Sequence, residues 1–99
     1  MTHPRHQLDD LLNAPVRFSL AAALASVEET DFRALRDALE VSDSLLSQHI
    51  KALEDAGYVR VRKGFVGKRP RTWLSLADPG RKAFTAHYDA LRTIASNSA

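Results

Sequence analysis

The sequence contains no cysteine and no long apolar run. The lack of cysteine excludes a disulfide framework, a thiolate zinc site and a cysteine nucleophile. The longest apolar stretch, Leu20 to Ala25, is far too short to span a bilayer, which takes about 20 apolar residues. The first ten residues include Asp9 and Asp10 and hold no apolar segment of signal-peptide length. We therefore expect a cytoplasmic protein with no membrane partner.

Enzymatic signatures are also missing. There are no paired carboxylates, no glycine-rich phosphate loop and no metal-binding spacing, and the serines lack the context of a nucleophile elbow. Among the histidines, His87 lies two residues from Asp89, so the two side chains cannot share a helix face as zinc ligands would. His49 is expected to pack, and His3 and His6 fall in an expected tail. The sequence predicts no enzymatic activity, no cofactor and no metal.

One segment lacks acidic residues altogether. Between positions 56 and 77 the charged residues are all basic: Arg60, Arg62, Lys63, Lys68, Arg69 and Arg71. Because the whole chain has a net charge of +2, the rest of it carries −4. Such segregation of charge is typical of a nucleic-acid-binding face. A solvated surface hairpin would show the same charges, so the neighbouring elements must decide between the two interpretations.

The chain is expected to form a single domain over residues 1–99. Its N-terminal part is predicted to begin with a flexible tail over residues 1–6, followed by two short helices. Residues 7–13 form an amphipathic segment, and Pro15 suits the first turn of the helix that follows. The apolar side of the first segment consists of Leu8, Leu11 and Leu12.

Residues 32–57 predict a helix-turn-helix. Asp31 and Ser42 are suitable N-caps for its two helices, and Glu40 interrupts the helical pattern between them. Gly57 is well placed to end the second helix in a left-handed conformation. The core face of the second helix consists of Leu46, Ile50 and Leu53. In such a motif the second helix enters the major groove, so its outward side chains are the candidate base readers.

The outward side chains of this helix are small or flexible. Gln48 can donate to and accept from an adenine edge, Leu45 can touch a thymine methyl group, and Lys51 suits a phosphate. Serines can contact phosphates or bases. The candidate DNA-binding residues of the helix are Ser42, Ser44, Leu45, Ser47, Gln48 and Lys51.

The hydrophobic period then changes from helical to alternating, which predicts a β-hairpin, or wing, over residues 58–77 with a flexible basic turn over residues 63–71. Basic side chains there would release counterions from phosphates, and arginine is favoured in a narrow minor groove. Trp73 is expected to anchor the core, whereas Phe65 fits either the core edge or an interface. The candidate DNA-binding residues of the hairpin are Lys63, Lys68, Arg69 and Arg71.

The final helix is predicted over residues 78–96, with Asp78 as its N-cap and Pro79 at its first position. Its apolar side and that of the N-terminal segment exceed what one small core can bury, which favours a homodimer over packing within one chain. Two half-sites would also give the specificity that one small domain lacks. The expected interface consists of Leu8, Leu11, Leu12, Phe84, Tyr88, Leu91 and Ile94.

The stretch from Ser47 to Val59, which reads Ser-Gln-His-Ile-Lys-Ala-Leu-Glu-Asp-Ala-Gly-Tyr-Val, resembles the recognition-helix signature of the MarR and ArsR groups of bacterial regulators. The resemblance continues through Lys63-Gly64-Phe65, Pro70-Arg71-Thr72 and Leu76-Ala77-Asp78-Pro79-Gly80-Arg81. From about Leu11 to Leu91 the chain looks especially like the compact, stand-alone winged helix-turn-helix DNA-binding family. Glu40 stands where many relatives have glycine. The resemblance implies a dimer whose wings flank the recognition helices.

Together these observations predict an α+β, mainly helical winged helix-turn-helix with a three-helix core, a β-hairpin wing and terminal dimerisation helices. The expected function is sequence-specific binding of double-stranded DNA by a homodimer that regulates transcription. One alternative is a winged helix used for protein–protein assembly, which would favour an acidic or apolar wing. Another is a regulator of the same fold that responds to a small-molecule effector or a metal.

Overall fold

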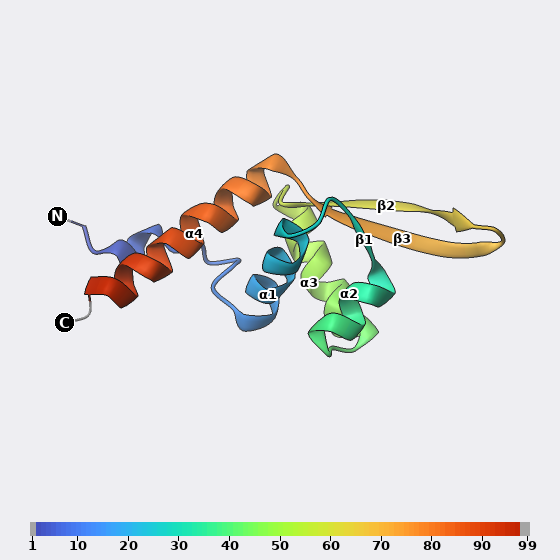
Figure 1. Cartoon of the computed structure of the whole chain (residues 1–99), viewed down its shortest axis with the longest axis horizontal. Coiled ribbons are helices and arrows are strands. Elements are labelled where there is room, and N and C mark those ends of the chain that lie inside the picture. Colours follow the sequence, from blue (N-terminus) through green and yellow to red (C-terminus); the bar gives the residue numbers. More distant parts are fainter. Residues whose placement is uncertain (1, 98–99) are drawn as a thin grey trace.

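The computed structural model describes residues 2–97 of the chain. It measures 56 × 25 × 20 Å, with a long hairpin projecting at one end and the last helix at the other (Figure 1). In chain order the elements are the 3-10 helix η1 (Pro4–Gln7), α1 (Pro15–Ala25), β1 (Thr30–Asp31), α2 (Phe32–Leu39), α3 (Asp43–Asp55), β2 (Val59–Val66), β3 (Arg69–Leu76) and α4 (Asp78–Asn97). They form the α+β winged helix-turn-helix that the sequence predicts.

Helices α1, α2 and α3 enclose the core together with the base of the hairpin. Pro15 is the first residue of α1, as predicted, and its missing N–H leaves no hydrogen bond unmade there. Asp31 caps α2, since its carboxylate accepts a hydrogen bond from Ala34 N at 2.7 Å. The buried core consists of Leu12, Leu20, Ala21, Leu24, Leu35, Leu46, Ile50, Leu53, Val59, Leu74 and Leu76. Every element except η1, β1 and α4 contributes at least one residue to this core. The apolar face of α3 is therefore held toward the core.

The turn between α2 and α3 contains Glu40 in an unusual conformation. Its backbone has φ 55° and ψ 46°, the left-handed region that glycine enters freely. A residue with a Cβ occupies that region at a cost of roughly 1–2 kcal/mol. Hydrogen bonds from Glu40 N to Asp37 O and from Val41 N to Arg36 O close the turn. The turn therefore keeps the geometry of a glycine turn although a glutamate occupies it.

Helix α3 ends at Gly57, as predicted, where a φ of 79° turns the backbone out of the helix. Tyr58 N donates to Leu53 O at 2.9 Å, and Gly57 N donates to Glu54 O at 2.9 Å. These are the two hydrogen bonds of a Schellman motif, which satisfies carbonyl groups at a helix end. The chain consequently leaves α3 in a defined direction and enters β2 within two residues.

Tyr58 ties the end of α3 to the N-terminal segment and to the start of α4. Its hydroxyl donates to the Asp9 carboxylate at 2.5 Å, and this hydrogen bond, together with burial, raises the pKa of Tyr58 to about 12. Its carbonyl accepts a hydrogen bond from Ala77 N at 2.9 Å. A Cβ added to Gly80 would lie 2.1 Å from the same carbonyl oxygen, so the close approach of the two backbones requires glycine at position 80.

The three strands form an antiparallel sheet in the order β1-β3-β2. Strands β2 and β3 pair without interruption as far as the Val66–Arg69 pair, so the turn consists of Gly67 and Lys68 alone. Gly67 has φ 64°, the positive value that a two-residue hairpin turn requires. The predicted flexible turn over residues 63–71 is therefore wrong, because most of that segment is paired strand.

Helix α4 begins at Asp78, the start of the predicted range, but its N-cap lies one residue earlier than predicted. The hydrogen bond from Arg81 N to Ala77 O, 2.9 Å long, places Ala77 at the N-cap, so Asp78 lies inside the first turn and Pro79 is the second helical residue. With 20 residues the helix is about 30 Å long, and its second half extends beyond the core to lie beside η1 (Figure 1). No helix within residues 2–97 is long and apolar enough to cross a membrane.

Residues 4–7 form η1 against α4, whereas the sequence predicts a flexible tail over residues 1–6. The Nδ1 atom of His3 accepts a hydrogen bond from Arg5 N at 3.0 Å and thereby caps the short helix. The tail prediction is therefore wrong for residues 4–6, because contacts with α4 hold them in place. Met1 lies outside the described residues.

The amphipathic segment over residues 7–13 contains no α-helix. The Asp9 carboxylate accepts hydrogen bonds from Leu11 N and Leu12 N at 2.8 and 3.2 Å, which folds the chain into a turn. Asp9 N donates to Nδ1 of the buried His87 at 2.9 Å and so joins the turn to α4. Leu12 is 1% exposed within the core of its own chain, which removes it from the expected dimer interface.

Candidate nucleic-acid interface

Helix α3 presents the outer face that the sequence predicts. Its inner residues Leu46, Ile50 and Leu53 are buried in the core. The Ser42 hydroxyl accepts a hydrogen bond from Leu45 N at 3.1 Å, so this side chain serves as the N-cap of the helix. The other candidate contact residues of α3 are all exposed: Ser44, Leu45, Ser47, Gln48 and Lys51. The face therefore offers side chains of the size and polarity that a DNA groove admits.

Two acidic residues of α3 are paired with neighbouring cations. Arg36 of α2 donates to Asp43 at 2.9 Å and to Asp37 at 3.0 Å, and these hydrogen bonds raise the pKa of Arg36. Within α3, Lys51 Nζ lies 3.2 Å from the carboxylate of Asp55, one helical turn further along. An exposed pair of this kind contributes at most about 1 kcal/mol, so Lys51 can exchange Asp55 for a phosphate at small cost.

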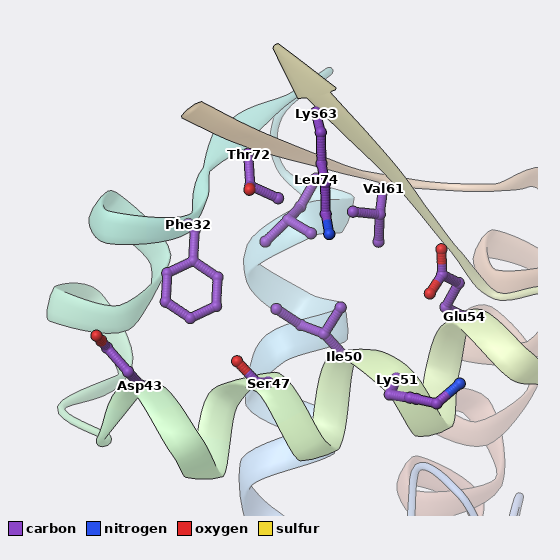
Figure 2. A pocket seen from close by; sticks show the side chains of 10 residues that line it. All are labelled: Phe32, Asp43, Ser47, Ile50, Lys51, Glu54, Val61, Lys63, Thr72 and Leu74. Atoms are coloured by element: carbon purple, nitrogen blue, oxygen red, sulfur yellow. The ribbon is translucent and has the colours of Figure 1, made fainter. Parts of the chain in front are cut away.

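An open cleft of about 430 Å³ lies between α3 and the hairpin (Figure 2). Lys63 extends from β2 toward α3, while Ser47 and Ile50 face the same space from the helix. The other lining residues are Phe32, Asp43, Lys51, Glu54, Val61, Thr72 and Leu74. The cleft therefore joins the outer face of α3 and one face of the hairpin into a continuous surface.

The two faces of the hairpin differ because side chains alternate along each strand. Val61 and Leu74 face α3 (Figure 2). On the opposite face the Arg62 guanidinium lies 4.1 Å from the centre of the Trp73 ring and donates to Glu29 at 2.7 Å. Trp73 is half-buried under this arginine and lies outside the core, so the prediction of a core anchor is wrong. Arg62 is likewise engaged within the chain.

The four cations predicted to bind DNA from the hairpin do not form one cluster. Lys63 faces α3, whereas Arg71 lies on the other face with its Nε 3.8 Å from the Asp31 carboxylate. Lys68 and Arg69 lie at the turn, are exposed, and form no ion pair with any residue between positions 2 and 97. These two cations at the end of the hairpin are the ones most available to a polyanion.

Arg33 is a candidate residue that the sequence analysis missed. Strand β1 pairs with β3 at residues 73 and 74, and this pairing brings the start of α2 beside the hairpin. Arg33, Arg69 and Arg71 there line a hollow of about 180 Å³ together with Asp31. The local sequence shows only that Arg33 follows the N-cap of α2 by two residues. Its position beside the hairpin arginines depends on a strand pairing between distant parts of the chain.

The two histidines of the folded body make contacts within the chain. His87 is 1% exposed, and burial lowers its pKa, so that the neutral ring accepts the hydrogen bond from Asp9 N. Burial also lowers the pKa of the half-buried His49, whose Nδ1 lies 3.2 Å from an Arg17 nitrogen. In the described part of the chain, no three histidine or acidic side chains are grouped as metal ligands would be.

The residues expected at a dimer interface differ in exposure. Tyr88 on α4 is 45% exposed, and the Arg92 guanidinium lies 5.8 Å from the centre of its ring. Phe84 and Leu11 pack partly against the core. The other expected residues are half-buried: Leu8, Leu91 and Ile94. A single chain thus covers much of the predicted set but leaves the Tyr88 side of α4 uncovered.

An exposed polar helix beside a basic hairpin defines the chain as a winged helix-turn-helix with the features of a nucleic-acid-binding surface. The chain belongs to the winged helix DNA-binding domain family, which it matches over residues 16–95. It is 29% identical over 87 residues to the uncharacterized protein MJ0432 of Methanocaldococcus jannaschii, an alignment that covers 88% of this chain and 95% of that protein.

Solved structures share the fold. A transcriptional regulator homologue protein from Pyrococcus horikoshii OT3 has a TM-score of 0.87 at 24% identity, with 97% of this chain and 96% of that chain covered. Overoxidized AbfR bound to DNA has a TM-score of 0.76 at 18% identity, with 93% and 67% covered. These likenesses show the shared fold, and the family match confirms the winged helix DNA-binding resemblance seen in the sequence.

Proposed function

We propose that this chain is a sequence-specific transcriptional regulator that binds double-stranded DNA as a homodimer. Helix α3 enters the major groove, and the hairpin contacts the backbone or the adjacent minor groove. The observation that carries the proposal is the exposed polar face of α3 lying next to unpaired cations of the hairpin, in a chain of the winged helix DNA-binding domain family. The protein needs no catalytic group for this role.

The outer face of α3 supports base reading. Gln48 is exposed near the middle of the helix and can form two hydrogen bonds with an adenine edge. The Arg36–Asp43 ion pair reduces the repulsion that a lone carboxylate would exert on phosphates near the start of α3. Lys51 needs only to leave Asp55 to reach a phosphate. Positioning contacts and base contacts can thus come from one helix face.

Helix α4 supports a two-fold dimer. Phe84, Tyr88 and Leu91 follow one another at spacings of four and three residues and therefore lie along one side of the helix. Tyr88 is 45% exposed on that side, and exposed contiguous apolar surface commonly marks an interface. A second copy packed there would present two α3 helices to one duplex, and this arrangement suits an inverted repeat.

The base-reading part of the proposal is tested with Gln48→Ala on duplexes selected from a random pool. The variant should lose discrimination at one or two base pairs, a loss of about 1–3 kcal/mol against the best site. Gln7→Ala makes the same chemical change on exposed η1 and should leave binding intact. Equal base preferences for Gln48→Ala and the wild type would show that Gln48 reads no base.

The dimer part is tested by sedimentation of Tyr88→Glu, which places a charge on the uncovered side of α4. Because an unpaired charge is costly to bury, this variant should sediment as a monomer and bind the selected duplex much more weakly. Thr93→Glu adds the same charge on an exposed polar position of α4 and should remain dimeric. A wild-type protein that is monomeric at micromolar concentrations and binds as one copy per duplex would contradict the proposed dimer.

A further inference from the structure

The outer part of the hairpin has a composition that folding does not explain. Strand β1 pairs with β3 only at residues 73 and 74, so the part of the hairpin nearer the turn is a two-stranded ribbon without a third strand. Figure 1 shows this ribbon projecting away from all the helices. Phe65 lies near its end and is 70% exposed, and its neighbour Val66 is 47% exposed. Neither side chain contributes to the core.

The ring of Phe65 lies on the side of the ribbon that faces α3. Side chains alternate along β2, so Phe65 shares a face with Val61 and Lys63, both of which line the cleft above α3. Its partner across the ribbon is Pro70, which adds a second apolar side chain. A duplex that contacts the outer face of α3 would therefore meet the Phe65 side of the ribbon, not its reverse.

The charges around Phe65 indicate a polyanionic partner. Lys63, on the same face as Phe65, and Lys68, in the turn, are exposed and form no ion pair within residues 2–97. There is no acidic residue between positions 56 and 77. An exposed aromatic ring between unpaired cations matches a partner that combines negative charge outside with flat apolar surfaces inside. Stacked base pairs bordered by two phosphate chains have this character.

We propose that Phe65 is an apolar wedge that enters the minor groove next to the α3 site and partly unstacks one base step. Lys63, on the same face as Phe65, and Lys68, in the turn, hold the phosphates on either side of the groove. Apolar side chains inserted from the minor groove unstack and kink a duplex in this way, and flexible pyrimidine–purine steps yield most easily. The inference rests on the proposed DNA-binding function and adds a deformation of the duplex at the hairpin.

The experiment uses the full chain and a selected duplex that carries 2-aminopurine at successive positions beneath the hairpin. The fluorescence of 2-aminopurine rises when the base loses its stacking partners. Wild-type protein should raise it at one step, and Phe65→Ala should abolish that rise and weaken binding about tenfold, a loss comparable to removing one stacked aromatic ring. The salt dependence of binding should be unchanged, because the phosphate contacts remain.

Two matched variants complete the test. Phe65→Leu keeps an apolar wedge and should retain most of the fluorescence rise. Val27→Ala truncates another apolar residue, 42% exposed and outside the hairpin, and should behave as the wild type. Tight binding of the wild type without a fluorescence rise at any step, or an undiminished rise with Phe65→Ala, would overturn the wedge and leave the proposed function standing. Failure of the wild type to bind any duplex would overturn both.

Discussion

Replacing Glu40 with glycine should stabilise the protein. Glu40 occupies the left-handed region at φ 55° and ψ 46°, which costs a residue with a Cβ roughly 1–2 kcal/mol. Glycine removes that cost but adds about 0.4–1 kcal/mol of conformational entropy to the unfolded chain. The carboxylate is exposed and forms no ion pair within residues 2–97, so its loss removes no ion pair. The expected net gain is about 0.5–1 kcal/mol.

Urea denaturation followed by circular dichroism measures this gain, and thermal unfolding should show a midpoint several degrees higher. Glu40→Ala is the matched control, because alanine removes the carboxylate and keeps the strained backbone. Glu40→Gly should therefore be more stable than both Glu40→Ala and the wild type. If the glycine variant is no more stable than the alanine variant, the left-handed turn is not strained and the reasoning about this position fails.

Three further predictions concern His87, Gly80 and the end of the hairpin. Because burial lowers the pKa of His87, the unfolded chain binds a proton more readily than the folded one, so stability should fall as the pH drops below about 6.5. His87→Asn keeps an acceptor for Asp9 N without titrating, and equal pH dependence in its urea midpoints would refute the role of His87. Gly80→Ala should lose about 1–3 kcal/mol, since its Cβ would lie 2.1 Å from Tyr58 O; an unchanged thermal midpoint would contradict this. Lys68→Gln should lower the slope of log affinity against log salt by roughly one, whereas an unchanged slope would show that Lys68 does not contact phosphate.

The helix-turn-helix was predictable because its signals are local. Ser42 and Gly57 mark the two ends of α3 by their own chemistry, one as a capping hydroxyl and the other through a positive φ. The spacing of Leu46, Ile50 and Leu53 then determines which face is outward. The residues proposed to read bases follow directly from that face.

The N-terminal segment was mispredicted because its structure depends on distant residues. Leu8, Leu11 and Leu12 have helical spacing, yet the Asp9 carboxylate caps a turn, and Asp9 N is held by His87 at a separation of 78 positions. No local pattern contains that contact.

The hairpin shows the same limit in its strand lengths and ion pairs. Glycine and proline within residues 63–71 indicate a loop by local chemistry, but continuous pairing between β2 and β3 extends both strands through them. Arg62 is engaged by Glu29, which lies 33 positions earlier in the chain, and Arg33 joins the hairpin arginines only through β1. Composition could identify a basic hairpin, but not which of its cations are unpaired.

Selection of bound duplexes from a random pool tests the central claim most directly, because the protein itself then determines which sequences are recovered. A two-fold dimer that inserts α3 into successive major grooves should enrich an inverted repeat whose half-sites lie about one helical turn, roughly 34 Å, apart. The enrichment should disappear with Tyr88→Glu and shift at individual base pairs with Gln48→Ala. Recovery of unrelated sequences, or of a single half-site bound by one chain, would contradict the account.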